Sequence, residues 1–130
     1  MCIKQILLLS VVILLIDIIW LSYGVDKLWQ KNVQSVQKSP LVIRKEYALL
    51  SYILIILGVW YFVQQHITKE TPMKQILFSS FLFGFILYGV FDFTNLAIFK
   101  DYDWKAALVD MLWGGFLTMI AVHITTKMTV

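Results

Sequence analysis

Three aspartates stand inside long apolar runs of this 130-residue chain, where a carboxylate is costly to bury. They are Asp17, Asp92 and Asp110. The stretch around the second, YGVFDFTNLAIF, adds Thr94 and Asn95 but contains no Lys or Arg. Like-charged acids that lie close together cannot all ionise, so such a cluster can exchange protons or hold a cation. Proton or cation handling is therefore the chemistry that these residues could perform.

The composition indicates that a membrane surrounds these acids. Hydrophobic residues make up 60% of the chain and charged residues only 15%, whereas about a quarter of a soluble domain is charged. A helix needs roughly 20 mainly apolar residues to cross the hydrocarbon core, and lipid leaves open strands unsatisfied. Four segments qualify: residues 3–23, 47–66, 73–99 and 106–126. We therefore predict an all-α, integral membrane four-helix bundle in a single domain, residues 1–130.

The long connection between the first two spans has a helical pattern of its own. Its apolar residues recur at helical spacing: Val25, Leu28, Trp29, Val33 and Val36. One interpretation is a short helix lying in the membrane interface over residues 25–37, and the alternative is a plain polar loop.

The basic residues favour one orientation. Seven lysines and arginines flank the spans on the side of the long first loop, and four flank them on the side of the termini. Because basic loops tend to stay in the cytoplasm, we predict a multi-pass protein whose long first loop is cytoplasmic. The lipid bilayer is then its surroundings. Nucleic acid is not an expected partner, since no basic cluster with interleaved aromatic residues is present.

The alternating direction of the spans places the three acids at one depth. Asp17 and Asp92 each precede the cytoplasmic end of their span by about seven residues, and Asp110 follows the start of its span by about four to six. At 1.5 Å per residue, all three should lie roughly 6–10 Å below the cytoplasmic surface. Three helices would thereby deliver an acid to one layer of the membrane.

Periodicity also predicts which helix faces point inward. A stripe of small and polar residues follows one side of the third span: Ser80, Gly84, Tyr88, Asp92 and Asn95. In the second span, Ser51, Gly58 and Gln65 recur every seven residues and predict another inward stripe. Small residues in such stripes let helices approach closely.

Two of the acids are followed by an indole. The first span contains D-I-I-W (Asp17, Trp20) and the fourth contains D-M-L-W (Asp110, Trp113), so each acid shares a helical face with its tryptophan. The ring faces of Trp20 and Trp113 could flank an organic cation. The alternative is that both tryptophans are membrane-interface residues.

These motifs resemble those of a known family. D-x-x-W-L in the first span, D-F-T-N-L in the third and D-M-L-W-G in the fourth are similar to motifs of small four-span membrane proteins classed as a domain of unknown function. The resemblance covers nearly the whole chain and implies the four-span layout, but no activity. Small multidrug-resistance transporters are similar in architecture alone, because this chain lacks their glutamate-centred motif.

Three hypotheses about function remain open. The leading one is a small carrier or binding protein for a cation, with proton coupling and a homodimer as options; Asp17 and Asp92 would accept the charge, and Asp110 would tune them. The alternative is a non-catalytic membrane module, or a partner-binding protein, whose aspartates join its helices by hydrogen bonds. A lipid-modifying enzyme is less favoured, since no nucleophile is paired with a base; it requires an opening beside Asp92.

The candidate ligand- or cation-binding residues combine acids, hydrogen-bonding groups and aromatic walls: Asp17, Trp20, Tyr88, Asp92, Thr94, Asn95, Asp110 and Trp113. No catalytic residue is assigned. No cofactor is expected, although carboxylate and amide oxygens of this kind suit a hard cation. In this hypothesis Asn95 orients the acids.

Overall fold

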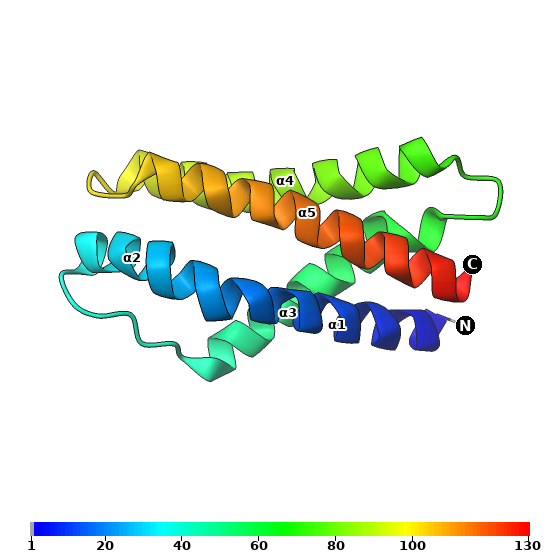
Figure 1. The fold of residues 1–130 in the computed structure, drawn as a ribbon, viewed down its shortest axis with the longest axis horizontal. Helices are drawn as coiled ribbons and strands as arrows, with labels where there is room; N and C mark the ends of the chain where they lie inside the picture. The colour runs from blue at the N-terminus through cyan, green and yellow to red at the C-terminus, as the bar shows by residue number, and fades with distance from the viewer. Residues whose placement is uncertain (1) are drawn as a thin grey trace.

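The computed structural model describes residues 2–130, apart from the side chain of Asp26, and this range contains helices and no strand. Figure 1 shows the elements, whose bounds are α1 (Cys2–Ile19), η1 (Trp20–Trp29), α2 (Gln30–Gln37), α3 (Lys45–Phe62), η2 (Gln64–His66), α4 (Met73–Ile98) and α5 (Trp104–Thr129). Within the described residues, four helical stretches are long and apolar enough to cross a membrane: Cys2–Val25, Lys45–His66, Met73–Ile98 and Trp104–Thr129. The predicted all-α four-helix bundle is confirmed.

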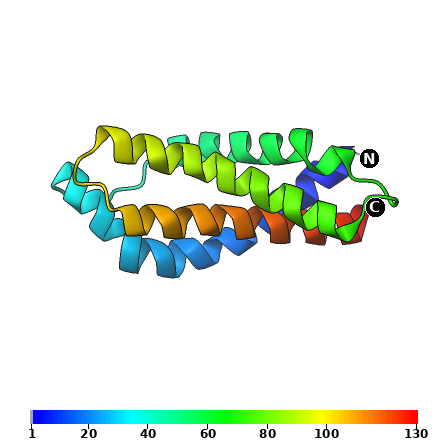
Figure 2. The ribbon, with the colours of Figure 1, turned by 90° about the horizontal axis from the view of Figure 1, so that it is seen from above.

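Both chain ends lie at one end of the bundle, and α2 lies at the other, together with the connection between α4 and α5 (Figures 1 and 2). We call these the terminal end and the α2 end. Figure 1 also shows that α3 is inclined, so that its beginning near Lys45 lies apart from α4 and its close lies nearer to it. The inclination separates α3 from α4 at the α2 end.

The first helix is longer than a membrane span. Its backbone stays helical from Cys2 to Gln37, through α1, η1 and α2. It ends at Lys38, which adopts the left-handed conformation (φ 61°) that commonly closes a helix. The segment 25–37 is therefore helical, but it continues the first span and is not a separate helix. Its placement in the membrane interface stays a prediction.

Close contact between α4 and α5 is made possible by glycine. A methyl group at Gly84 would collide with the backbone carbonyl oxygen of Gly114 and with Thr118, so the two helices touch there through their backbones. On the same face of α4, Ser80 and Asp92 are buried, and Tyr88 and Asn95 are partly buried. The inward stripe predicted for the third span therefore faces α5.

The stripe predicted for the second span holds only in part: Gly58 is partly buried and lies next to Phe83 of α4. Ser51 and Gln65 are exposed, and the buried face of α3 is instead formed by Ile56 and Val59, with Tyr52 partly buried. Gln65, in η2, can face outward because its side-chain amide donates to the backbone carbonyl of Tyr61 in the last turn of α3, at 2.8 Å. A polar residue that satisfies itself locally does not mark an inner face.

Substitution of Gly84 tests the contact between α4 and α5. Gly84→Ala should lower the free energy of unfolding by about 1–3 kcal/mol, because the added methyl meets backbone that cannot move aside cheaply. The matched control is Gly58→Ala on α3, where the nearest atom to the new methyl is the tip of the Phe83 ring, at 3.4 Å. Both changes raise helix propensity equally, so their difference isolates packing. Unfolding in mixed micelles, followed by circular dichroism, gives both values; equal values would contradict the packing.

Candidate functional site

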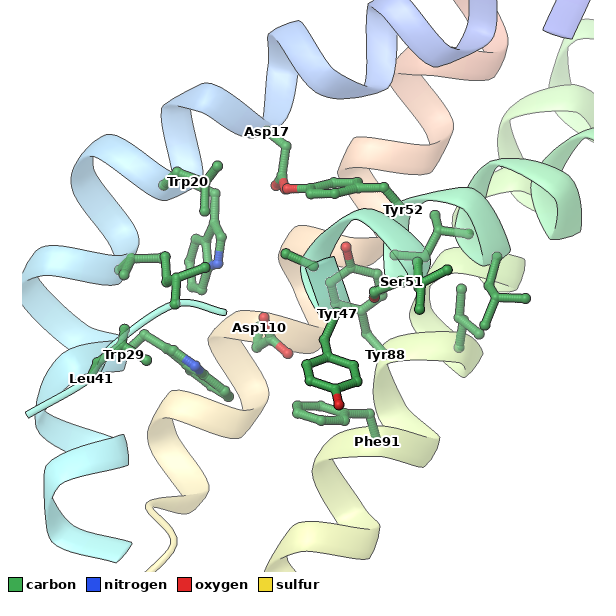
Figure 3. Close-up of a pocket in the computed structure, with 18 residues that line it drawn as sticks. Asp17, Trp20, Trp29, Leu41, Tyr47, Ser51, Tyr52, Tyr88, Phe91 and Asp110 are labelled. Atoms are coloured by element: carbon green, nitrogen blue, oxygen red, sulfur yellow. The ribbon is translucent and has the colours of Figure 1, made fainter. Parts of the chain in front are cut away.

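Asp17 joins three helices at one point. Its carboxylate is buried near the close of α1, accepts a hydrogen bond from the indole nitrogen of Trp113 on α5 at 2.8 Å, and accepts another from the Tyr52 hydroxyl on α3. Each oxygen therefore has a donor. Figure 3 shows the side chains of Asp17 and Tyr52 directed toward each other from α1 and α3.

The two acid–indole motifs interlock across α1 and α5. Trp113, from the motif in the fourth span, donates its indole N–H to Asp17 of the first span. Its ring stacks on Trp20, with ring centroids 5.8 Å apart and an interplanar angle of 17°. The sequence pattern placed each tryptophan beside the acid of its own helix. The structure pairs Trp113 with the acid of the other helix, so the repeat of the motif is used to join the two spans.

Asp92 and Asp110 form a second group, between α4 and α5. Asp92 is fully buried, and its Oδ1 accepts a hydrogen bond from the Tyr102 hydroxyl at 2.7 Å. Its Oδ2 has no donor within the described residues, and the Asp110 carboxyl lies within hydrogen-bonding reach of Asp92. Two carboxyl groups can form a hydrogen bond with each other only if one of them is protonated.

The hydroxyl of Tyr102 is the hydrogen-bond donor to Asp92. This residue lies in the connection between α4 and α5, outside the four spans. Burial raises the pKa of the Tyr102 phenol above its ordinary value, so the hydroxyl stays protonated throughout the physiological range and donates to Asp92. Asn95 lies within hydrogen-bonding reach of the same hydroxyl. Asn95 therefore lies next to the residue that donates to Asp92.

Tyr88 stands between the two groups. Its ring packs on Gly114, where no side chain intervenes, and it lies within electrostatic range of all three aspartates. Asp17 and Asp110 are also within electrostatic range of each other. The structure therefore brings seven of the eight candidate residues into one region of the bundle. The exception is Thr94, which is exposed, two positions and over half a turn from Asp92.

A pocket of about 700 Å³ adjoins the acids at the α2 end. Its polar lining residues are Asp17, Ser51 and Asp110, and its aromatic lining residues are Trp20, Trp29, Tyr47, Tyr52, Tyr88 and Phe91. Figure 3 shows Asp110 projecting from α5 toward the space bordered by Trp29 and Tyr47. The lining residues that the structure describes include no Lys, Arg or His. Asp92 is not among them either, so it lies behind Asp110 as seen from the pocket.

The π-helical winding of η1 shapes one wall of this pocket. Trp20, Val25 and Trp29 all line it, although they are five and then four positions apart. In an α-helix, Trp20 and Trp29 would be about two and a half turns apart and would face opposite sides. In a π-helix each turn closes at i→i+5, so residues four or five apart share a face. The wider winding therefore turns both tryptophans toward the pocket.

Contacts at the α2 end hold this wall in place. Trp29 packs edge-on against Tyr102 with ring centroids 5.9 Å apart, and the Asn32 side chain accepts a hydrogen bond from the backbone nitrogen of Asp103 at 2.8 Å. Lys38 and Asp101 add an exposed ion pair at 3.2 Å. The connection between α4 and α5 is thereby fixed against η1 and α2, and Tyr102 with it.

Four contributors to the site were missed in the sequence: Trp29, Tyr47, Tyr52 and Tyr102. Tyr52 had a usable signal, because it lies four positions before the buried Ile56 on the same face of α3. Tyr102 had none, since it lies in a connection, and the π-helical winding that places Trp29 was also not visible.

The hard-cation hypothesis gains no support, because the described residues include no group of three acidic, histidine or cysteine side chains placed to hold a metal.

Removal of one donor tests the role of Asp17. Tyr52→Phe leaves a buried carboxylate oxygen without a partner, so we expect the free energy of unfolding to fall by about 1–2 kcal/mol. The matched control is Tyr47→Phe, because Tyr47 is exposed and lies one turn earlier on α3; its effect should stay within about 0.5 kcal/mol. Chemical unfolding in micelles measures both. A loss of the same size in the two variants would show that Asp17 does not depend on Tyr52.

Comparison with known proteins gives one match. A family model described as "Predicted membrane protein (DUF2177)" matches residues 2–127. Searches of curated proteins and of solved structures found no match. The family match and the four spans together show an integral, multi-pass membrane protein. The family resemblance seen in the motifs is confirmed: the chain belongs to the DUF2177 family of predicted membrane proteins.

Proposed function

We propose that this protein is a small carrier or binding protein that holds a cation against Asp110 and exchanges it for a proton. One observation supports this most directly. Asp110 lines the pocket, is only 6% exposed, and receives no hydrogen bond from a donor in the described residues. Its polar neighbour is another acid, Asp92. A buried carboxyl without a donor, facing a cavity, needs either a proton or a positive charge beside it.

The acids have different roles in this proposal. Asp17 already receives hydrogen bonds from Trp113 and Tyr52, so its charge is satisfied by the protein. We therefore assign Asp17 to joining the helices, and we assign the charge-accepting role to Asp110, with Asp92 as the partner that shares its proton. This differs from the roles inferred from the sequence, in which Asp17 and Asp92 accepted the charge.

The exchange conserves charge. In this proposal, the empty site holds one proton between the neighbouring carboxyls of Asp92 and Asp110, where it can complete a hydrogen bond between them. A monovalent cation beside Asp110 favours the ionised form of both groups, so the shared proton leaves to water. One cation then replaces one proton, and the net charge of the site is unchanged.

The second candidate is the non-catalytic module, and the hydrogen bonds at Asp17 favour it. In that case Asp92 and Asp110 would also serve only to join α4 and α5. The enzyme hypothesis required an opening beside Asp92, but Asp92 is fully buried and does not line the pocket. The homodimer and the cytoplasmic first loop stay predictions.

Proton release distinguishes the two candidates. Purified protein in weakly buffered micelles with a pH-sensitive dye would receive sodium, magnesium, tetramethylammonium or decyltrimethylammonium chloride in turn. We expect at least one of these cations to release about one proton per chain, since the pair holds one proton. Asp110→Asn should abolish the release while circular dichroism stays unchanged, because an amide can still form the hydrogen bond.

Asp101→Asn is the matched control for charge removal, since Asp101 is exposed and lies outside the pocket. This variant should release protons like the unmodified protein. If no cation in the panel releases a proton, or if Asp110→Asn releases as many as the unmodified protein, the exchange does not occur at this pair.

A further inference from the structure

We infer that the ligand of this pocket is an amphipathic organic cation that enters from the bilayer between α3 and α4. The inference rests on the proposed function, because Asp110 supplies the countercharge. It goes further by naming the chemical class of the ligand and the route that the ligand takes.

The walls of the pocket suit a large apolar body. Apart from Asp17, Ser51 and Asp110, every lining residue is aliphatic or aromatic. A volume of about 700 Å³ falls in the range of pockets that hold organic molecules, and it far exceeds the needs of an inorganic ion. The described residues also offer no group of three ligating side chains to a metal. The ligand must therefore bring hydrocarbon as well as charge.

The charge of the ligand follows from the lining. Asp17 and Asp110 are the acids among the described lining residues, which include no basic side chain, so a phosphate group would find no partner among them. Aromatic ring faces attract cations, especially where water is excluded. Trp20, Trp29 and Tyr88 supply such rings beside the acids. A lipid-like amine or quaternary ammonium fits this arrangement, and an anionic amphiphile does not.

The entry route follows from the exposure of the rim. Tyr47 and Leu54 on α3 line the pocket and are 60% and 71% exposed, and Phe91 on α4 lines it and is also exposed. These residues belong to predicted spans, so the surface they expose faces acyl chains. Figure 1 shows that the beginning of α3 lies apart from α4 here. On the side of the pocket formed by η1 and α2, by contrast, Trp29 and Asn32 are held against the connection between α4 and α5. The open side of the pocket is therefore its lipid side.

Photoaffinity labelling tests both parts of the inference. The probe is a dodecylammonium with a diazirine on its alkyl chain, added to the protein in phosphatidylcholine vesicles. After illumination, we expect crosslinks in peptides that contain Leu50, Leu54, Leu87 and Phe91. Decyltrimethylammonium should compete and tetramethylammonium should not. Asp110→Asn should reduce these crosslinks about tenfold, the equivalent of about 1.4 kcal/mol. An uncharged alcohol with the same diazirine chain should show no dependence on Asp110.

A steric variant tests the route separately. Leu54→Trp fills the gap at the rim and should slow or reduce labelling, whereas Leu49→Trp should not. Leu49 is the matched control, because it is exposed on α3 and does not line the pocket. If both variants label like the unmodified protein, the ligand does not enter between α3 and α4.

Two results would overturn the ligand class. The first is crosslinking that does not depend on Asp110 and spreads over the lipid-facing surfaces of all four spans, which would show partitioning without a site. The second is competition by tetramethylammonium that equals competition by decyltrimethylammonium, which would show that the hydrocarbon adds nothing. In the second case, proton release by the small cation would leave the proposed exchange intact. If no cation releases protons, the proposed exchange of a cation for a proton is contradicted, whatever the crosslinks show.

Discussion

The hydrogen bonds to Asp17 are the interaction on which the rest of the arrangement depends. Trp113 and Tyr52 reach this one carboxylate from α5 and α3, and α1 carries it, so three helices meet at a single polar point. Lipid offers little hydrophobic drive to hold helices together, so such a point does much to set their positions. The stacking of Trp20 on Trp113 follows directly from it. The wall of the pocket then begins one turn beyond Asp17.

A second constraint, the backbone contact at Gly84, turns two separate acids into a pair. Because α4 and α5 touch there, Asp92 and Asp110 come within hydrogen-bonding reach of each other. The two constraints give the acids different surroundings. Asp17 is fully provided with donors, whereas Asp110 is not and faces the cavity. Similar residues in similar sequence surroundings therefore differ in what they can do, and the difference comes from the neighbours that the fold supplies.

The sequence predicted what depends on composition and α-helical period. The four spans and the inward stripe of the third, with Gly84 and Asp92, follow from these alone. It could not predict what depends on partners from distant segments. Tyr102 donates to Asp92 from the connection between α4 and α5, and Trp113 donates to Asp17 although the two lie 96 positions apart in the sequence. Gln65 did not mark an inner face, because its side-chain amide donates to the backbone carbonyl of Tyr61. The π-helical winding was not predicted, because the apolar residues of this segment were compared only with the α-helical period.

That winding ties two properties of the molecule to one stretch of backbone. Residues 20–29 hold Trp29 against both the cavity and Tyr102, and Tyr102 in turn supplies Asp92 with its donor. Rewinding this stretch to an ordinary α-helix would swing Trp29 round by about half a turn relative to Trp20. The indole would leave the cavity wall, and Tyr102 would lose its edge-on contact with Trp29. The winding of one short stretch therefore shapes the cavity and also supports the hydroxyl that donates to Asp92.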